Sequence, residues 1–492
     1  MVDTIPAVLR AAAERHGERP AYVEGERATS FAELLERVRR TAAGYVSLGV
    51  DPGDRVAVWA PNSVDWVVAA LAVHYAGGTL VPVNSRYTGH EAADLVERSR
   101  ARLVVVEDGF LGRTQIADLR AASPLPDVRE VLDLADLGEL DGNRDVADAR
   151  ATAVTEGDVA DILFTSGTTG RPKGATSAHH QTVGVARVWG ELGGVGADDR
   201  YLVVNPFFHS FGYKVGIVTG LLTGATLYPV GTFDVDATMA LIESAGITLL
   251  PGAPTIYQSI LEAPGRDGHD LSSLRLAVTG AAVVPVVLIE RMREELKIDT
   301  VVTAFGMTEA VVATMCRDGD SAETVATTCG RPVPGMEARI AEETGELLLR
   351  GDYVMLGYLD DPAATAEAID ADGWLHTGDV GTIDEAGNLS LTDRLKDMYI
   401  CGGFNVYPAE VEQTLARLDG VVDVAVVGVP DERMGEVGRA YVVRRGDLTS
   451  DDVVAFAKER LANFKVPRSV EFTDALPRNA SGKVLKTELR TR

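Results

Sequence analysis

The sequence predicts an α/β protein: a large N-terminal domain of parallel βαβ sheets with a small β-barrel-like subdomain, then a small mobile α+β C-terminal domain. A chain of 492 residues is longer than one hydrophobic core usually supports, so we expect two or more domains. As far as residue 305, strand-like apolar runs alternate with segments of helical periodicity, which is typical of parallel sheets flanked by helices. After residue 331 the runs become short and are separated by turns.

The alternation begins near the N-terminus, where Val8, Leu9 and Ala12 recur at helical spacing within residues 5–16. Two βα blocks follow, separated by residues 127–158, which are acidic and poorly periodic and are expected to form a surface excursion. We expect the two blocks to form two sheets that share a core. The predicted strands are 21–23, 55–60, 79–83, 102–106, 201–204, 225–228, 248–250, 274–279 and 300–305; the predicted helices are 63–75, 90–98, 212–222, 235–244, 254–261 and 285–296.

The charged run 393–397 is interpreted as the junction between the two domains. This gives a large N-terminal domain at 1–392, a hinge at 393–397 and a small C-terminal domain at 398–492. Short strands at 346–350 and 389–392 precede the hinge. The C-terminal domain is expected to contain helices 409–418 and 450–461, strands 421–427, 439–444 and 469–472, and a basic tail.

The composition is that of a soluble globular protein, with 46% hydrophobic and 24% charged residues. A net charge of -26 opposes nonspecific binding to nucleic acid or anionic membranes, so an anionic substrate needs a locally positive site. Three cysteines without paired or metal-like spacing indicate a reducing compartment. The start of the chain lacks a secretory signal, and the most apolar stretch, 66–83, is interrupted by glycine and proline. We therefore expect a cytoplasmic protein without integral membrane contact.

Residues 165–174 read TSGTTGRPKG and follow the apolar run 162–164. Glycines let backbone N–H groups approach a ligand closely, hydroxyls add donors, and Lys173 adds a compact positive charge. The loop is not a Walker A motif, because Pro172 stands where that motif needs Gly-Lys-Ser/Thr. It is interpreted as a phosphate cradle rather than a solvated hairpin. The candidate residues are Thr165, Ser166, Gly167, Thr168, Thr169, Gly170 and Lys173.

Two further clusters follow predicted strands, where ligands bind in α/β folds. The first comprises Gly280, Ala281 and Ala282, and the second runs from Phe305 to Glu309. Near the C-terminus, residues 479–483 read NASGK.

In their order along the whole chain, these motifs resemble those of the acyl-CoA synthetase, adenylation-domain and luciferase superfamily. The resemblance implies that ATP and a carboxylic acid form an acyl-adenylate, with Mg²⁺ bound, and that coenzyme A then captures the acyl group. It also implies roles around the nucleotide. Phe305, where most members have tyrosine, would pack on adenine beside Gly306, Thr308 would contact the α-phosphate, and Glu309 would bind Mg²⁺.

The same resemblance implies further roles for residues of the second half of the chain. Asp379 and Arg394 would hold the ribose, Lys396 would be the pivot of domain rotation, Gly402 and Gly403 would line the thiol tunnel, and Lys483 would be the catalytic cation. His209 would lie at the inner end of the acyl pocket, although its aromatic surroundings alone favour a hydrogen-bonded core histidine. Lys396 also remains open to interpretation as a solvated linker charge. His179 and His180 are expected to face solvent.

Together these residues predict an AMP-forming acid:CoA ligase. Residues 205–209, 278–282 and 397–408 are similar to those of actinobacterial ligases that activate the bicyclic propanoate left from sterol rings C and D, which implies a steroid-ring-derived or other cyclic acid. The alternative is an amide-bond synthetase, in which an amine captures the adenylate with the same adenylation residues. A carrier-protein loading domain and a catalytically inactive nucleotide-binding regulator are weaker alternatives. The sequence leaves the oligomeric state open, including whether the chain is a homodimer.

Overall fold

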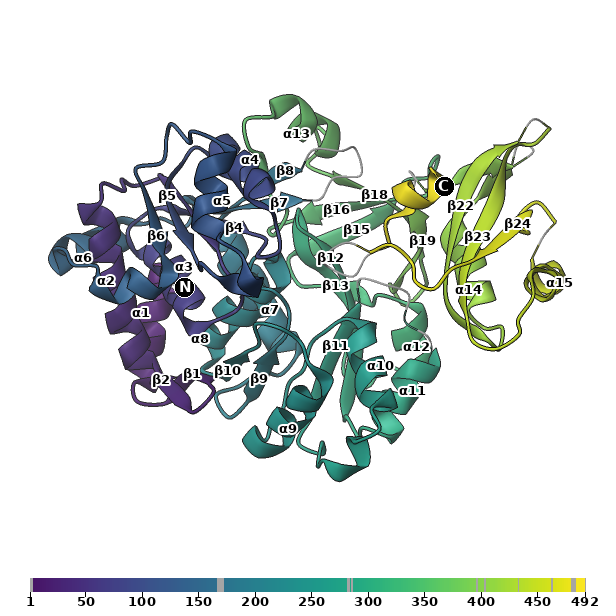
Figure 1. Cartoon of the computed structure of the whole chain (residues 1–492), viewed down its shortest axis with the longest axis horizontal. Coiled ribbons are helices and arrows are strands. Elements are labelled where there is room, and N and C mark those ends of the chain that lie inside the picture. The colour runs from purple at the N-terminus through teal and green to yellow at the C-terminus, as the bar shows by residue number, and fades with distance from the viewer. Residues whose placement is uncertain are drawn as a thin grey trace.

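The structure, a computed structural model, describes residues 3–165, 172–280, 284, 286–394, 397–401, 404–431, 433–461, 463–478 and 484–491, with backbone only at 393, 394, 404 and 405. Figure 1 shows a large N-terminal part and a smaller C-terminal part, which contains β22, β23 and α15. The predicted α/β class with two unequal parts is confirmed.

The first sheet of the large part has seven strands. Five neighbouring strands run parallel to one another. The strand that ends at residue 165 is the first of these, and it also forms an antiparallel hairpin with the strand that begins at residue 173. In spatial order the strands are β17 (Gly357–Tyr358), β8 (Lys173–Ala178), β7 (Val159–Thr165), β4 (Thr79–Val83), β3 (Arg55–Trp59), β5 (Ala101–Val106) and β6 (Glu130–Asp133). Helices of this region are α2 (Phe31–Ser47), α3 (Val64–Tyr75), α4 (Gly89–Ser99), α5 (Gln115–Ala122) and α6 (Arg144–Ala153).

The second sheet is assembled from two four-stranded groups that Leu249 joins through parallel bridges to Tyr201 and Leu276. One group is β2 (Arg27–Ser30), β1 (Pro20–Glu24), β10 (Thr226–Pro229) and β9 (Arg200–Val203); the other is β11 (Leu276–Gly280), β12 (Thr300–Met307), β13 (Ala310–Met315) and β14 (Arg331–Pro332). The associated helices are α1 (Ile5–His16), α7 (His179–Leu192), a π-helix (Phe211–Val218), α8 (Thr219–Thr223), α9 (Val235–Ala245), α10 (Pro254–Glu262), α11 (Val286–Glu294) and α12 (Ala322–Thr327).

Two antiparallel sheets complete the fold. The first is the counterpart of the predicted barrel-like subdomain, and its hydrogen bonds follow the open order β15 (Met336–Ile340), β16 (Glu346–Gly351), β18 (Leu375–Ile383) and β19 (Leu389–Arg394), with α13 (Pro362–Ala368) nearby. The C-terminal sheet contains β20 (Tyr399–Cys401), β21 (Phe404–Val406), β22 (Val421–Asp431), β23 (Gly435–Arg444) and β24 (Ser469–Phe472). Its helices are α14 (Pro408–Leu415), α15 (Ser450–Arg460) and α16 (Lys486–Arg490).

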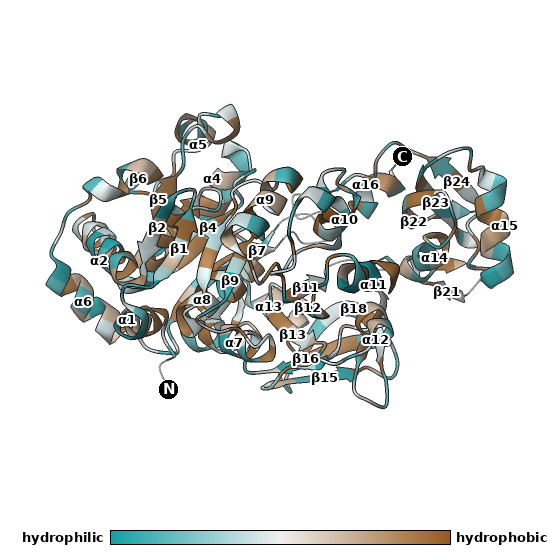
Figure 2. Cartoon of the chain, turned by 90° about the horizontal axis from the view of Figure 1, so that it is seen from below, coloured by the Kyte–Doolittle hydropathy of each residue, from teal (hydrophilic) through white to brown (hydrophobic). Residues whose placement is uncertain are grey.

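Hydrophobic cores follow the same division. Among the described residues, the large part contains two buried clusters, one extending from Ile5 to Leu389 and a smaller one from Ala57 to Ile162, and the C-terminal part contains a separate one from Tyr399 to Leu489. In Figure 2 the inner strands around β4 are brown and helix α6 at the edge is largely teal, as expected for central parallel strands buried on both faces. Serine side chains accept backbone N–H bonds at two helix starts, Ser30 for α2 and Ser63 for α3, which explains why these helices begin there.

Several sequence-based expectations for this part of the fold were wrong. Residues 127–158 are not only a surface excursion, because β6 adds an edge strand to the first sheet and α6 packs on α2. The predicted helix 212–222 is a π-helix followed by a short α-helix. His179 is 1% exposed rather than solvent-facing, because its Nδ1 accepts the backbone N–H of Ile5 at the start of α1.

Candidate active site

Glycines place the ends of strands β11 and β12 side by side. These strands are parallel neighbours with Gly280 opposite Ala304, and a Cβ at Gly280 would lie 2.6 Å from the Ala304 carbonyl oxygen. At Gly306 the pairing with β13 shifts register, and a Cβ there would lie 1.8 Å from the Val311 carbonyl oxygen. Only glycine fits such a β-bulge. The bulge sends the chain directly into the turn formed by Thr308 and Glu309.

The predicted phosphate loop connects the two strands of the β7–β8 hairpin. Thr165 ends β7 and lies opposite Lys173, which begins β8. Their backbones are also joined through the Thr165 hydroxyl, which donates to the Lys173 carbonyl oxygen at 3.4 Å. The hairpin therefore fixes both ends of the loop, and residues 166–171 lie outside the described part of the chain.

Lys173 and Glu309 are brought together by Tyr358, a residue that the sequence analysis missed. The Lys173 Nζ lies over the Tyr358 ring, 5.0 Å from its centroid. The Tyr358 hydroxyl donates to the Glu309 Oε1 at 2.8 Å. Burial and the neighbouring Glu309 carboxylate raise the pKa of Tyr358, so its hydroxyl stays protonated and remains a donor. A lysine from the loop hairpin and a carboxylate from the β12–β13 turn thus share one tyrosine.

Backbone hydrogen bonds hold this tyrosine in place. β17 pairs with β8, with Tyr358 opposite Ala175, and the Leu359 N–H donates to the Gly174 carbonyl oxygen at 2.8 Å. Just before β17, the Met355 N–H donates to the Glu309 carbonyl oxygen at 2.8 Å. Glu309 itself is only 7% exposed, so its carboxylate orientation is restricted.

A second group of contacts links Phe305 to Asp379. Phe305 lies opposite Thr314 in the β12–β13 ladder, and the Thr314 hydroxyl donates to the Cys329 carbonyl oxygen at 2.7 Å. Burial, Cys316 and the nearby Asp379 carboxylate raise the pKa of the Cys329 thiol to about 12. Cys329 also lies beside the strands that carry Asp379, because its N–H donates to the carbonyl oxygen of Leu389 in β19, the strand that pairs with β18. The residues expected at adenine and at ribose belong to one neighbourhood.

The backbone around Asp379 is shaped by a left-handed glycine. Gly378 has φ +70°, and its N–H donates to the Glu346 Oε1 at 2.9 Å. The Asp379 N–H then donates to the Thr377 hydroxyl, and Asp379 lies opposite Arg394 in the β18–β19 ladder. Both residues expected at the ribose thus stand on adjacent strands, although the structure describes only the backbone of Arg394.

His209 lies in the turn after β9, at the same sheet edge as Gly280. The preceding Asn205 donates from its amide to the Pro251 carbonyl oxygen, and the Gly252 N–H donates to the carbonyl oxygen of Val278 in β11. The His209 Nδ1 accepts the Phe211 N–H at 3.2 Å, and desolvation lowers the pKa of the imidazole although solvent reaches the side chain. A neutral ring with Nδ1 occupied carries its proton on Nε2, which is a donor.

The other predicted site residues lie outside the described part of the chain. They are Ser166, Gly167, Thr168, Thr169, Gly170, Ala281, Ala282, Lys396, Gly402, Gly403 and Lys483. Their assigned roles stay predictions.

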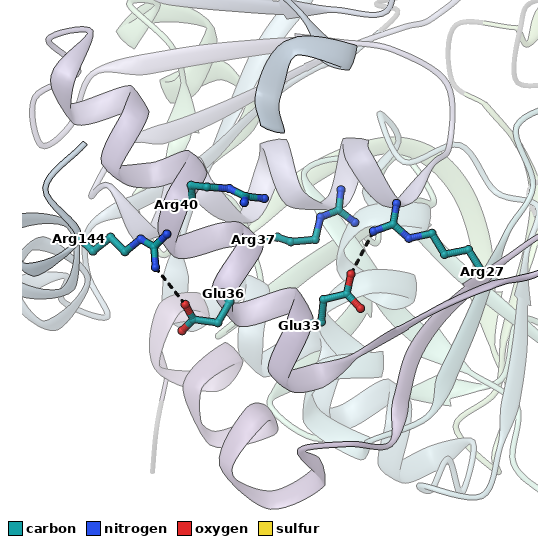
Figure 3. A pocket seen from close by; sticks show the side chains of 6 residues that line it. All are labelled: Arg27, Glu33, Glu36, Arg37, Arg40 and Arg144. Carbon is teal, nitrogen blue, oxygen red and sulfur yellow. Dashed lines mark hydrogen bonds and ion pairs between the residues drawn. The ribbon is translucent and has the colours of Figure 1, made fainter. Parts of the chain in front are cut away.

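A cavity of about 280 Å³ elsewhere does not resemble an active site (Figure 3). It lies along α2 and α6, and its lining residues are Arg27, Glu33, Glu36, Arg37, Arg40 and Arg144. Arg27 pairs with Glu33 at 3.0 Å and Arg144 with Glu36 at 3.5 Å, so part of the positive charge is offset. In the described ranges no cluster of three or more His, Cys, Asp or Glu residues is arranged to hold a metal ion. No helix there is long and apolar enough to cross a membrane.

Comparison with protein families identifies the arrangement. The AMP-binding enzyme model matches residues 9–359, and the model of the AMP-binding enzyme C-terminal domain matches residues 410–483. The chain belongs to the AMP-binding enzyme family. The two matches cover the elements that carry the loop hairpin, Glu309 and Tyr358, and extend in the C-terminal domain as far as Lys483.

Individual relatives match over nearly the full length. The 3-((3aS,4S,7aS)-7a-methyl-1,5-dioxo-octahydro-1H-inden-4-yl)propanoyl:CoA ligase of Rhodococcus jostii is 58% identical, with 99% of this chain and 98% of that protein covered. The ligase of the same name from Mycobacterium tuberculosis is 56% identical, with the same shares of the two chains covered. Among solved structures, ATP-bound MatB from Rhodopseudomonas palustris superposes with a TM-score of 0.88 at 31% identity, covering 100% of this chain and 99% of that one.

Proposed function

We propose that this protein activates a bicyclic carboxylic acid with ATP and transfers the acyl group to coenzyme A. The general reaction, acyl-adenylate formation followed by thioester formation, is that of an AMP-forming acid:CoA ligase, and the chain is such an enzyme by its family and its full-length similarity to named CoA ligases. The acid is proposed to be a propanoate attached to a fused ring system, as in the names of the two relatives above 55% identity.

The observation that best supports this proposal is the link from Lys173 through Tyr358 to Glu309. An ammonium group and a buried carboxylate at adjoining strand ends suit a site that neutralises and orients a triphosphate. The Phe305 and Asp379 neighbourhood suits the nucleoside. On this arrangement Lys173 would contact the β- and γ-phosphates, Asp379 would accept from the ribose hydroxyls, and Thr308 would donate to the α-phosphate.

The donor set fits magnesium. Mg²⁺ usually binds nucleotides through one or two protein carboxylates while substrate phosphates and water complete its shell, so a single buried acid is sufficient. Tyr358 orients one oxygen of the buried Glu309 carboxylate, and the second oxygen would bind the metal. When bound there, the metal would offset the charge that gathers on the phosphates.

His209 is proposed to orient the substrate carboxylate. Its neutral ring would present the Nε2 proton to an oxygen of the acid, while Nδ1 remains bound to the Phe211 N–H. Lys483, from the C-terminal domain, is proposed to stabilise the developing charge between the α-phosphate and the carboxylate. Lys396 would be the pivot that removes Lys483 before coenzyme A enters beside Gly402 and Gly403.

A panel of acids tests the substrate assignment. Pyrophosphate release would be measured with the bicyclic propanoate, with ferulate and with linear acids of matched length, all with ATP and Mg²⁺. We expect the highest kcat/KM for the bicyclic acid. A linear or aromatic acid that reacts as well would contradict the proposed substrate class while leaving the acid:CoA ligase reaction intact.

A further inference from the structure

A buried network of charged and polar side chains connects the phosphate-loop hairpin to the π-helix that follows His209. Lys214 is 1% exposed and Asp161 is fully buried, and the Lys214 Nζ lies 3.0 Å from the Asp161 Oδ1. The same ammonium donates to the Ser177 hydroxyl at 2.8 Å, and the Thr182 hydroxyl donates to the Asp161 Oδ2 at 2.8 Å. None of these side chains takes part in the proposed reaction.

The neighbouring titratable groups of this network are neutral. The Tyr213 hydroxyl lies 2.7 Å from the His74 Nε2, and the His74 ring contacts that of His179. Burial lowers the pKa of His74 well below its ordinary value and raises that of Tyr213 well above it. Lys214 and Asp161 therefore carry the two charges at the centre of the network, and the charge of each offsets that of the other.

The position of each partner suggests why the pair exists. Asp161 and Ser177 lie opposite one another in β7 and β8. β7 ends at Thr165 and β8 begins at Lys173, so both strands lead to the phosphate loop. Thr165 follows Asp161 by four positions along the strand, a distance of about 13 Å. Lys214 lies on the π-helix, which begins two residues after His209. The π-helix packs against α7 and α8, so the Lys214 side chain is what reaches across to the hairpin.

Stability alone does not explain the pair. Desolvating two charges costs free energy that their attraction only partly recovers, and buried ion pairs are often replaced by apolar residues at no loss of stability. Removing one partner is different, because it leaves an uncompensated buried charge. In some proteins a buried polar or charged pair restricts which alternative packing is allowed, and π-helical turns are frequent at functional sites.

We propose that Lys214 and Asp161 are positioning residues, which hold the His209 turn and the phosphate-loop hairpin in one fixed register so that the acid and ATP meet correctly. This inference rests on the proposed function, because it assigns the acid to the His209 side and the triphosphate to the hairpin. Neither residue touches a substrate. The pair sets the distance between two elements that each hold one.

The test uses the double variant Lys214→Met/Asp161→Asn, in which both charges are removed and the asparagine still accepts from Thr182. We expect it to unfold at nearly the wild-type temperature, whereas Lys214→Met alone is destabilised by the charge it leaves behind. At restored stability, kcat/KM for acid-dependent pyrophosphate release should remain roughly 10- to 100-fold low, the size of effect produced by small misplacements of reacting groups. The loss should fall on kcat more than on the KM for ATP.

A matched control comes from another ion pair of the same sheet. The Arg275 Nη2 lies 2.6 Å from the Asp199 Oδ2, where these residues precede β11 and β9 at the opposite strand ends from the site. The double variant Arg275→Met/Asp199→Asn should leave kcat unchanged. A Lys214→Met/Asp161→Asn protein with normal stability and normal kinetics would overturn the positioning role.

Two further measurements keep the inference testable. If the double variant does not fold, Ser177→Ala provides the test, since it removes the hydrogen bond from Lys214 to β8 and keeps both charges. A reduced kcat/KM at unchanged stability would support the proposal. Unchanged kinetics would refute it. If wild-type protein releases no pyrophosphate with any acid, the proposed function fails. The positioning role then fails with it, whereas an active wild-type protein and a double variant with wild-type kinetics would overturn the positioning role alone.

Discussion

Replacing Tyr358 with phenylalanine should weaken adenylation by removing one hydrogen bond while keeping the ring under Lys173. The lost bond is the 2.8 Å contact from the hydroxyl to the Glu309 carboxylate. Hydrogen bonds to charged groups contribute about 1.5–3 kcal/mol, and the half-buried position of Tyr358 favours the lower end. Since ~1.4 kcal/mol corresponds to a factor of ten in rate, we expect kcat/KM to fall roughly tenfold.

The assay is acid-dependent pyrophosphate release at several Mg²⁺ concentrations. Because Tyr358 orients the proposed metal ligand, the variant should need more Mg²⁺ for half-maximal rate. Tyr358→Leu, which also removes the ring beside Lys173, should lose more activity than Tyr358→Phe. Tyr228→Phe, in strand β10 of the other sheet, is the control and should behave like wild type. An unchanged Mg²⁺ requirement in Tyr358→Phe, with an unchanged rate, would refute the proposed orientation of Glu309.

The remaining predictions concern Lys483, the bulge at Gly306, the buried His179 and the proposed metal. Lys483→Ala should abolish pyrophosphate release but spare thioester formation from supplied acyl-adenylate, measured by product chromatography; equal loss of both steps would contradict this division. Gly306→Ala should lower both the unfolding temperature and kcat, because its Cβ would meet the Val311 carbonyl oxygen at 1.8 Å; a variant with wild-type stability and kcat would be evidence against the bulge. Burial lowers the pKa of His179 from 6.5 to about 4, so the unfolded chain binds more protons between these values. The free energy of unfolding should therefore fall as pH falls from 6.5 towards 4, by roughly 3 kcal/mol from this group, and urea titrations of His179→Gln should show a shallower fall. Chelating Mg²⁺ with EDTA should stop pyrophosphate release and leave the unfolding temperature of the ATP-free protein unchanged; full activity in EDTA would contradict a metal at Glu309.

Elements with a strong apolar period and a defined start could be predicted from the sequence. The predicted helix 5–16 and strand 79–83 coincide with α1 and β4. The predicted helix 63–75 is offset by one residue, because Ser63 is the cap that precedes α3. Strand β5 and helices α9 and α10 also lie within a residue of their expected bounds. Local sequence was sufficient in these cases because burial pattern and end signals agree.

Contacts between distant segments could not be predicted this way. Tyr358 lies 49 residues from Glu309 and belongs to a two-residue strand, which has no periodicity to detect. A signal was nevertheless present, since the Gly357–Tyr358 pair follows an apolar stretch and precedes the proline-started helix α13. The solvent-facing prediction for His179 is wrong because helical spacing alone does not reveal its contacts with the Ile5 N–H of α1 and the His74 ring of α3. Lys214 reads as an ordinary helix charge until Asp161 is placed beside it.

The candidate site was predicted from motifs rather than from periodicity. The structure describes Lys173, Glu309, Phe305 and Asp379. Tyr358 contacts Lys173 and Glu309, and Cys329 is bonded to Thr314 opposite Phe305 and to Leu389 in the strand that pairs with that of Asp379. The alternation of strands and helices in the sequence indicates that these residues follow strand ends. The distances between them, however, depend on how the sheets pack. That packing is a property of the whole hydrophobic core.

The most direct test of the account is product analysis with ATP, Mg²⁺ and the bicyclic propanoate, with and without coenzyme A. Acid alone should give pyrophosphate and enzyme-bound acyl-adenylate, and coenzyme A should convert that intermediate to acyl-CoA and AMP. An amine that yields amide as efficiently without coenzyme A would instead identify an amide-bond synthetase. Absence of acid-dependent pyrophosphate from every acid tried would contradict adenylate formation itself.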